Sequence, residues 1–239
     1  MAKSPSAAAA PRMSAFPPAG IPDSAFEALE ARMRAKSLCF VGNSLTYWNR
    51  GVDTMVRGLA PGATTQTIVE GGATLESHWR AGRADGLNGG GFDYVVLQDD
   101  LPETTAESFA AHAAKWIDAV RGADATPILF CAHAYARLPR YDDDAIAELH
   151  AAVGETHDVA VAPVGAARRA AAAALGVELF DADGEHPSLA GTYLAACVVA
   201  ATIFGPDVLA AEKPYRPKNL KAALAAQLRD VALGQAAPS

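Results

Sequence analysis

The chain alternates short apolar runs with longer segments in which apolar residues recur at helical spacing. Four of the short runs are apolar without strict alternation, which is typical of strands covered on both faces in a parallel sheet. The run TTQTIV is more polar and is predicted as an edge strand. The five predicted strands cover 37–41, 64–69, 94–97, 127–131 and 159–164.

Helical periodicity fills the intervals between these strands. A helix follows each strand, and such repetition with right-handed crossovers builds an open, doubly wound sheet with helices on both faces. Ligands of such sheets bind beyond the carboxyl ends of the strands, so the strand-to-helix turns are the segments in which to seek chemistry. The predicted helices cover 23–35, 45–59, 73–81, 104–121, 143–155, 166–175, 189–204 and 218–232.

The domain organisation follows from where this pattern starts. Residues 1–22 carry an alanine run that Pro11 and Arg12 interrupt, and they are expected to be a flexible lead-in. Residues 23–239 are then expected to form a single domain. No composition change divides it, and its glycine- and proline-rich joints are predicted as internal loops.

Composition narrows the class of protein. Twenty basic against 27 acidic residues give a formal charge of −7, without the basic cluster that a nucleic-acid partner requires. No apolar stretch reaches the roughly 18 residues of a membrane helix. Cys39, Cys131 and Cys197 are far apart and flanked by apolar residues, so they are predicted as buried reduced thiols. We expect a soluble cytoplasmic protein with no metal, no cofactor and no membrane or nucleic-acid partner.

The turn after the first strand holds the first candidate for chemistry. It reads Gly42-Asn43-Ser44-Leu45-Thr46 and places Ser44 at the start of a helix. Unpaired backbone N–H groups and the helix dipole favour an oxygen there that becomes negative. Serine is also a preferred N-cap, and a serine at such a position, taken alone, more often has only a capping role.

A nucleophilic serine needs a base, and His186 is the best placed of the six histidines. In Asp183-Gly184-Glu185-His186, a carboxylate three residues ahead of the imidazole can accept from the ring N–H. That bond selects the tautomer and leaves the other nitrogen free to take a proton from a serine. Asp181 and Glu185 compete for the orienting role. The alternative is a helix-capping loop with a solvent-exposed histidine.

Acyl transfer also needs donors for the oxyanion of the tetrahedral intermediate. Gly71-Gly72 follows the second strand, where missing side chains let a backbone N–H approach a substrate. Gln98 directly follows the third strand candidate, Tyr94-Val95-Val96-Leu97. The alternatives are a tight turn for the two glycines and strand-end solvation for Gln98.

In this order the motifs resemble the SGNH (GDSL-like) hydrolases, a family of serine esterases and lipases. The segment 42–46 is similar to the nucleophile block, with Asn43 where aspartate is usual. Gly71-Gly72 is similar to the second block, VVLQ lies where the third is expected, and Asp183-x-x-His186-Pro187-Ser188 matches the closing block. The resemblance implies a flavodoxin-like three-layer α/β/α sandwich around a five-stranded, mainly parallel sheet.

The resemblance also implies roles for individual residues. Ser44 would be the nucleophile, His186 the base and Asp183 the orienting carboxylate, with the backbone N–H groups of Ser44 and Gly72 in the oxyanion hole. The third block departs from the family's common GxND, because Asp100 stands at the asparagine position and a carboxylate cannot donate. A branch with a VLQEQS-like segment is a closer likeness and favours Gln98 as the donor, with Asp100 as the alternative.

The predicted function is hydrolysis of a small-molecule or carbohydrate ester through an acyl-enzyme. Two alternatives stay open: an acyltransferase that uses the same site, and a flavodoxin-like binding module in which Asp100 has disabled catalysis. Tyr47, Trp48 and Trp79 are candidates to line a substrate pocket, although aromatic residues near such turns more often belong to the core. Short acyl groups are favoured because no long apolar lid is visible, and the oligomeric state stays open.

Overall fold

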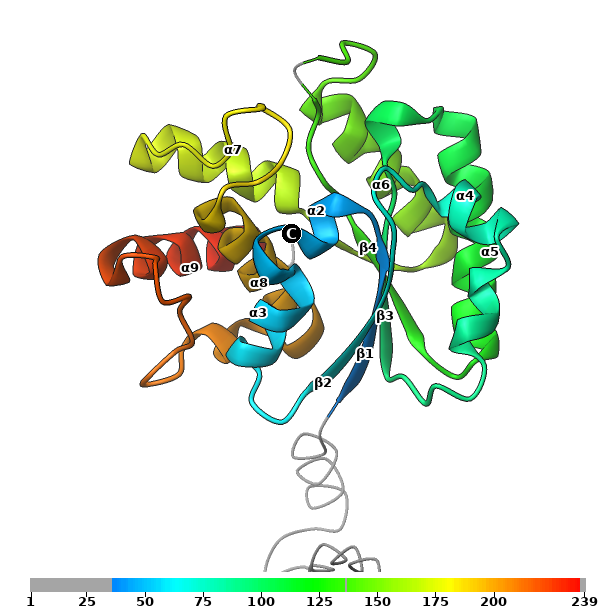
Figure 1. Ribbon diagram of the computed structural model, residues 1–239, viewed down its shortest axis with the longest axis horizontal. Coiled ribbons are helices and arrows are strands. Elements are labelled where there is room, and N and C mark those ends of the chain that lie inside the picture. The colour runs from blue at the N-terminus through cyan, green and yellow to red at the C-terminus, as the bar shows by residue number, and fades with distance from the viewer. Residues whose placement is uncertain (1–35, 136, 237–239) are drawn as a thin grey trace, which may run out of the picture. The chain divides into compact units, whose positions relative to one another are not determined.

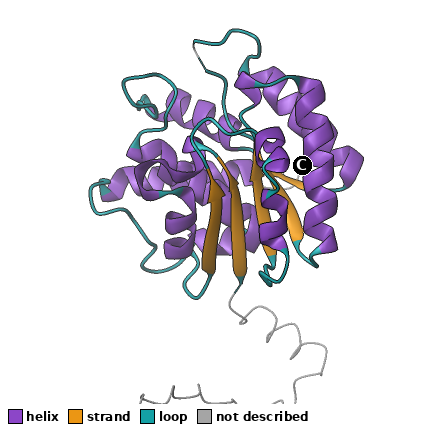
Figure 2. Ribbon diagram, turned by 45° about the vertical axis from the view of Figure 1, so that its right-hand side comes forward, coloured by secondary structure: helices purple, strands orange, loops and turns teal. Residues whose placement is uncertain are grey.

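The computed structural model describes residues 36–135 and 137–236, and the lead-in and the helix predicted over 23–35 lie outside them (Figures 1 and 2). Five strands form one sheet in the order β2-β1-β3-β4-β5, and every neighbouring pair is parallel. The polar run 64–69 is the edge strand that its pattern predicted. The strands are β1 (Ser37–Gly42), β2 (Thr64–Val69), β3 (Tyr94–Gln98), β4 (Thr126–Phe130) and β5 (Ala160–Ala162).

Helices cover both faces of this sheet (Figure 1). Along β1, Leu38 and Phe40 join one buried apolar cluster while Cys39 and Val41 join the other, as alternating side chains of a strand between two helix layers do. The predicted three-layer α/β/α sandwich is confirmed. The first layer holds α3 (Val52–Leu59), α7 (Val164–Leu175), α8 (Leu189–Phe204) and α9 (Ala222–Ala236), and the second holds α4 (Leu75–Arg80), α5 (Ala106–Gly122) and α6 (Asp143–His157).

Helix α8 is the central helix of the first layer. Its side chains are apolar nearly all round and almost all buried, which is the pattern of a helix enclosed by protein. Ser188 caps it by accepting the Gly191 N–H at 3.3 Å. Within residues 36–135 and 137–236, no helix has both the length and the apolar character that a membrane crossing needs. The three cysteines are free and buried, as the sequence predicts.

The structure departs from the predicted elements mainly after β1. The single helix expected over 45–59 is a short helix α2 (Ser44–Tyr47), a 3₁₀ turn (Trp48–Arg50) and then α3, because Asn49 and Arg50 adopt positive φ angles of 52° and 78°. Strand β5 is shorter than predicted, and α9 starts four residues later than expected. Further 3₁₀ turns cover Arg83–Leu87, Leu101–Glu103 and Pro206–Leu209.

The register of the sheet brings the turns that are predicted to carry chemistry to one edge. Gly42 pairs with Val69, and Val41 pairs with Leu97, so β1, β2 and β3 end side by side. The chain turns from β1 to β2 on one side and reaches β3 on the other, which makes the end of β1 the topological switch point of the sheet. The turn that carries Ser44 therefore stands where such folds bind their ligands.

Candidate active site

Ser44 is the first residue of α2, at the carboxyl end of the inner strand β1. The capping role that a serine could have there belongs to Asn43, whose Oδ1 accepts the Leu45 N–H at 2.9 Å. The Ser44 hydroxyl instead lies 2.9 Å from Nε2 of His186. The local fold thus leaves this hydroxyl available to the imidazole.

His186 connects Ser44 to Asp183. The imidazole Nδ1 lies 2.7 Å from Asp183 Oδ2, and because a carboxylate can only accept, Nδ1 carries the proton and Nε2 faces Ser44 with its lone pair. The Glu185 N–H, the His186 ring and the His186 N–H all bind the Asp183 carboxylate and lower its pKa to about 2. Asp183 is therefore ionised at neutral pH and holds this tautomer.

The two competing carboxylates have other partners. Asp181 accepts the indole N–H of Trp48 at 2.7 Å, and Glu185 accepts from Arg137 Nε at 2.5 Å. The structure thus brings Ser44, His186 and Asp183 into one chain of contacts.

The three aromatic candidates for a substrate pocket lie in different environments. Trp48 stacks on the His186 ring, with ring centroids 4.1 Å apart and an interplanar angle of 22°. Tyr47 is 38% exposed, and its hydroxyl lies close to Gly71. Trp79 packs edge to face with Trp116 of α5 in a buried apolar cluster, which is the core role. Trp48 supports the imidazole directly.

Three further residues hold the loop that carries His186, and sequence reasoning assigned none of them. Asn49 Nδ2 donates to the Pro187 carbonyl at 2.7 Å, buried His133 donates from Nε2 to the Glu185 carbonyl at 2.8 Å, and Arg137 pairs with Glu185. Burial lowers the pKa of His133 to about 4, so its ring is neutral. The signal available for His133 was its place two residues after the fourth strand candidate.

Gln98 is fully buried at the end of β3 and braces the Ser44 turn. Its Oε1 accepts the Asn43 N–H at 2.8 Å and the Thr46 hydroxyl at 3.1 Å. These donors identify the oxygen of the amide, so Nε2 is the atom that donates to the Asp99 carbonyl at 2.6 Å. The side chain connects β3 to the turn after β1.

The other two candidates for the oxyanion hole are also placed by the structure. Asp100 accepts the Tyr135 hydroxyl at 2.8 Å, and burial raises the pKa of Asp100 to about 6. Gly72 has a φ of +66°, a left-handed backbone conformation that glycine adopts without strain. Gln98, Asp100 and Gly72 as oxyanion contacts remain predictions.

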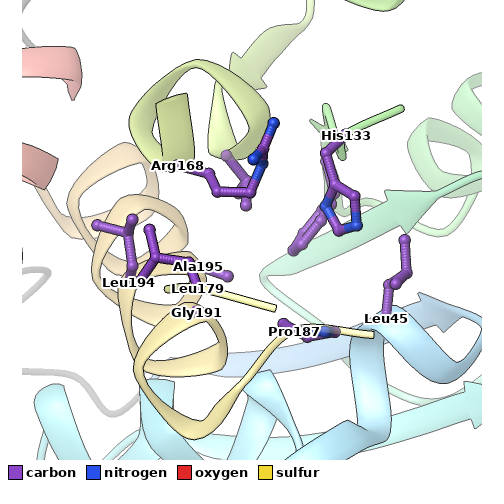
Figure 3. A pocket seen from close by; sticks show the side chains of 10 residues that line it. Leu45, His133, Arg168, Leu179, Pro187, Gly191, Leu194 and Ala195 are labelled. Atoms are coloured by element: carbon purple, nitrogen blue, oxygen red, sulfur yellow. The ribbon is translucent and has the colours of Figure 1, made fainter. Parts of the chain in front are cut away.

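A small cavity of about 20 Å³ lies next to the Ser44 turn and the loop that carries His186 (Figure 3). Leu45 and Pro187, the chain neighbours of Ser44 and His186, line it together with His133 and Arg168. Its volume suits roughly one water-sized group. In the part of the chain that the structure describes, no group of three or more histidine, cysteine, aspartate or glutamate side chains could hold a metal ion.

Solved structures resemble this chain over most of its length. A protein from Slackia heliotrinireducens, described as a candidate SGNH hydrolase, is 30% identical, with a TM-score of 0.62 over 71% of this chain and 100% of that one. A DUF4886 family protein from Bacteroides uniformis is 16% identical, with a TM-score of 0.65 over 84% of this chain and 94% of that one. No protein-family model and no curated protein matches.

A third similar structure is a candidate GDSL-like lipase from Parabacteroides merdae. It is 14% identical, with a TM-score of 0.59 over 72% of this chain and 96% of that one, and so shows a common fold. The Slackia protein has the higher sequence identity to this chain, 30%, and the match spans all of that protein. This chain belongs to the SGNH hydrolase family.

Proposed function

We propose that this chain hydrolyses carboxylic esters through an acyl-enzyme, with Ser44 as nucleophile, His186 as base and Asp183 as the orienting carboxylate. The observation that carries the proposal is the unbroken line of contacts from Ser44 Oγ to His186 at 2.9 Å and on to Asp183 at 2.7 Å. It joins two segments 142 residues apart at the switch point of the sheet. Membership of a hydrolase family supports the same reaction class.

Each step uses groups that the site holds. His186 Nε2 takes the Ser44 proton as Oγ bonds to the carbonyl carbon, and the carbonyl oxygen becomes an oxyanion. The N–H groups of Ser44 and Gly72 donate to it. The intermediate collapses, and the alcohol leaves with the proton from His186. Water then attacks the acyl-enzyme by the same route, which releases the acid and restores Ser44.

The imidazolium formed in this cycle has two sources of stabilisation in the site. Asp183 lies 2.7 Å away and is ionised, so it attracts the new charge. The Trp48 ring covers one face of the imidazole, and an aromatic face attracts a cation. The proposed substrate is a small-molecule or carbohydrate ester with a short acyl group.

The triad is tested by Ser44→Ala, His186→Ala and the double variant on p-nitrophenyl acetate. Each single variant should lose most of the turnover, and the double variant should be little worse, because the two residues act as a unit. A fluorophosphonate probe should label Ser44 of the wild-type chain, as read by mass spectrometry of the peptides. His157→Ala, at the last residue of α6, is the control and should stay within about twofold.

Two results would reject the proposal. Additive losses in the double variant would separate Ser44 from His186. A chain that hydrolyses no ester and reacts with no phosphonate would instead support a binding module.

A further inference from the structure

One buried carbonyl joins the two turns that the proposed oxyanion hole requires. Gly42 O accepts the backbone N–H of Glu70 at 3.2 Å and Nε2–H of His78 at 2.9 Å. Gly42 lies two residues before Ser44, and Glu70 lies directly before Gly71-Gly72. The position of this carbonyl is therefore common to both turns.

The other side of the His78 ring leads back to Glu70. Arg83 Nη1 lies 2.9 Å from His78 Nδ1, and because a guanidinium can only donate, Nδ1 is unprotonated and His78 is neutral. The same guanidinium forms an ion pair with the Glu70 carboxylate. These contacts form a closed circuit that runs from Gly42 O through His78, Arg83 and Glu70 back to Gly42 O, and we call this circuit of contacts the ring.

The environment of His78 is consistent with this neutral form. The side chain is fully buried on α4, and burial lowers its pKa. The charged groups that face it are Arg83, which also lowers the pKa, and Glu70, which opposes that effect. Protonation of Nδ1 would place its N–H against the N–H of Arg83, and this contact of the ring would break.

We propose that His78, oriented by Arg83 and Glu70, is a positioning residue that keeps the Ser44 turn and the Gly71-Gly72 turn in register. The inference rests on the proposed function, since it assigns the two N–H donors of the oxyanion hole to these turns. Small misplacements of such donors weaken transition-state stabilisation more than substrate binding. The ring should therefore affect kcat rather than KM.

The exposed part of the ring offers a variant that should fold normally. The side chains of Arg83 and Glu70 are 34% and 59% exposed, and exposed ion pairs contribute little to stability. Arg83→Ala should lower kcat about three- to tenfold, leave KM within about twofold and shift Tm by no more than about 2 °C. Arg80→Ala is the matched control, because Arg80 pairs with Glu76 on the same helix and should leave kcat unchanged.

The buried part of the ring is tested by two substitutions at His78. His78→Leu removes the donor to Gly42 and should lower kcat at least tenfold. His78→Gln can donate from its amide nitrogen to the same carbonyl, so it should stay within about threefold of the wild type. The double variant of His78→Leu with Arg83→Ala should be no slower than His78→Leu, because Arg83 acts through His78.

A second measurement tests the contacts of the ring without depending on catalytic activity. ¹⁵N NMR should show His78 Nδ1 unprotonated at neutral pH, and Arg83→Ala should raise the pH at which His78 takes up its proton. A protonated Nδ1 in the wild type, a folded His78→Leu with wild-type kcat, or a His78→Gln no better than His78→Leu would overturn the inference while the triad stands. A wild-type chain without esterase activity would overturn the proposed function, and the inference would fall with it.

Discussion

Three acidic side chains precede His186 within five residues, and each has a different partner. Asp183 binds the imidazole, Asp181 binds the Trp48 indole, and Glu185 binds Arg137. The partner of each carboxylate decides its role. Asp183 orients the imidazole, Asp181 orients the tryptophan that covers the imidazole, and Glu185 holds the loop that carries the imidazole. These residues are therefore not interchangeable, although the sequence presents them side by side.

A residue-scale prediction separates Gln98 from Asp100. Gln98→Ala removes the acceptor of the buried Asn43 N–H and the amide expected to face the oxyanion, so kcat should fall about ten- to a thousandfold with little change in KM. Asp100→Asn keeps an oxygen for the Tyr135 hydroxyl and should stay within about threefold. Steady-state kinetics at one pH measures both variants. A gain in Asp100→Asn beside an unaffected Gln98→Ala would move the oxyanion role to Asp100.

Ser44 directly follows β1, whereas Asp183 and His186 lie on the loop between α7 and α8. The order of motifs, through its resemblance to a known family, nevertheless predicted these three residues as neighbours. It could not predict Asn49 or His133, whose partners Pro187 and Glu185 lie 138 and 52 residues away. Contacts of this kind leave no periodic signal in the sequence. The residues that hold the site together therefore become visible only once the chain is folded.

At the scale of elements, the same limit explains the helix break after Ser44. Apolar spacing continues from 45 to 59 and predicts one helix, but Asn49 adopts a left-handed conformation that asparagine tolerates better than most residues. Its amide then reaches the Pro187 carbonyl and the Thr192 hydroxyl. A long-range contact thus accompanies the break, and local periodicity carries no information about it. The strands were predicted more closely because their apolar runs are short and bounded by turn residues.

An element-scale prediction concerns the contact between α8 and the loop before it. A Cβ at Gly191 would lie 2.2 Å from the Leu179 carbonyl oxygen, so Gly191→Ala must displace α8 or the loop that continues to His186. We expect a loss of about 1 to 3 kcal/mol in the free energy of unfolding, together with reduced esterase activity. Gly234→Ala in α9 meets open space and should be neutral or slightly stabilising. Urea unfolding compares the two, and equal effects would contradict the predicted clash.

At the scale of the whole molecule, buried ionisable groups act on stability in opposite directions. Burial raises the pKa of Asp99 to about 7 and lowers the pKa of His133 and His150 to about 4. Between about pH 4 and 6.5, Asp99 therefore keeps its proton in the folded state but loses it in the unfolded chain. Over the same range, the two histidines are unprotonated in the folded state but protonated in the unfolded chain. As pH rises from 4 to 6.5, the histidines favour folding and Asp99 opposes it.

The effect of Asp99 can be isolated by Asp99→Asn. The carboxyl group titrates near 3.9 in an unfolded chain and at about 7 in the fold, so its stabilising effect is complete below 3.9 and is lost as pH rises through 7. Asparagine cannot ionise, and the histidine effects cancel between variant and wild type. The free energy of unfolding of the variant, relative to the wild type, should therefore be higher at pH 8 than at pH 5 by on the order of 2 kcal/mol.

Urea unfolding at the two pH values measures this difference, with Asp118→Asn on the exposed face of α5 as the control. A difference that does not change with pH would mean that Asp99 ionises in the fold as it does in the unfolded chain.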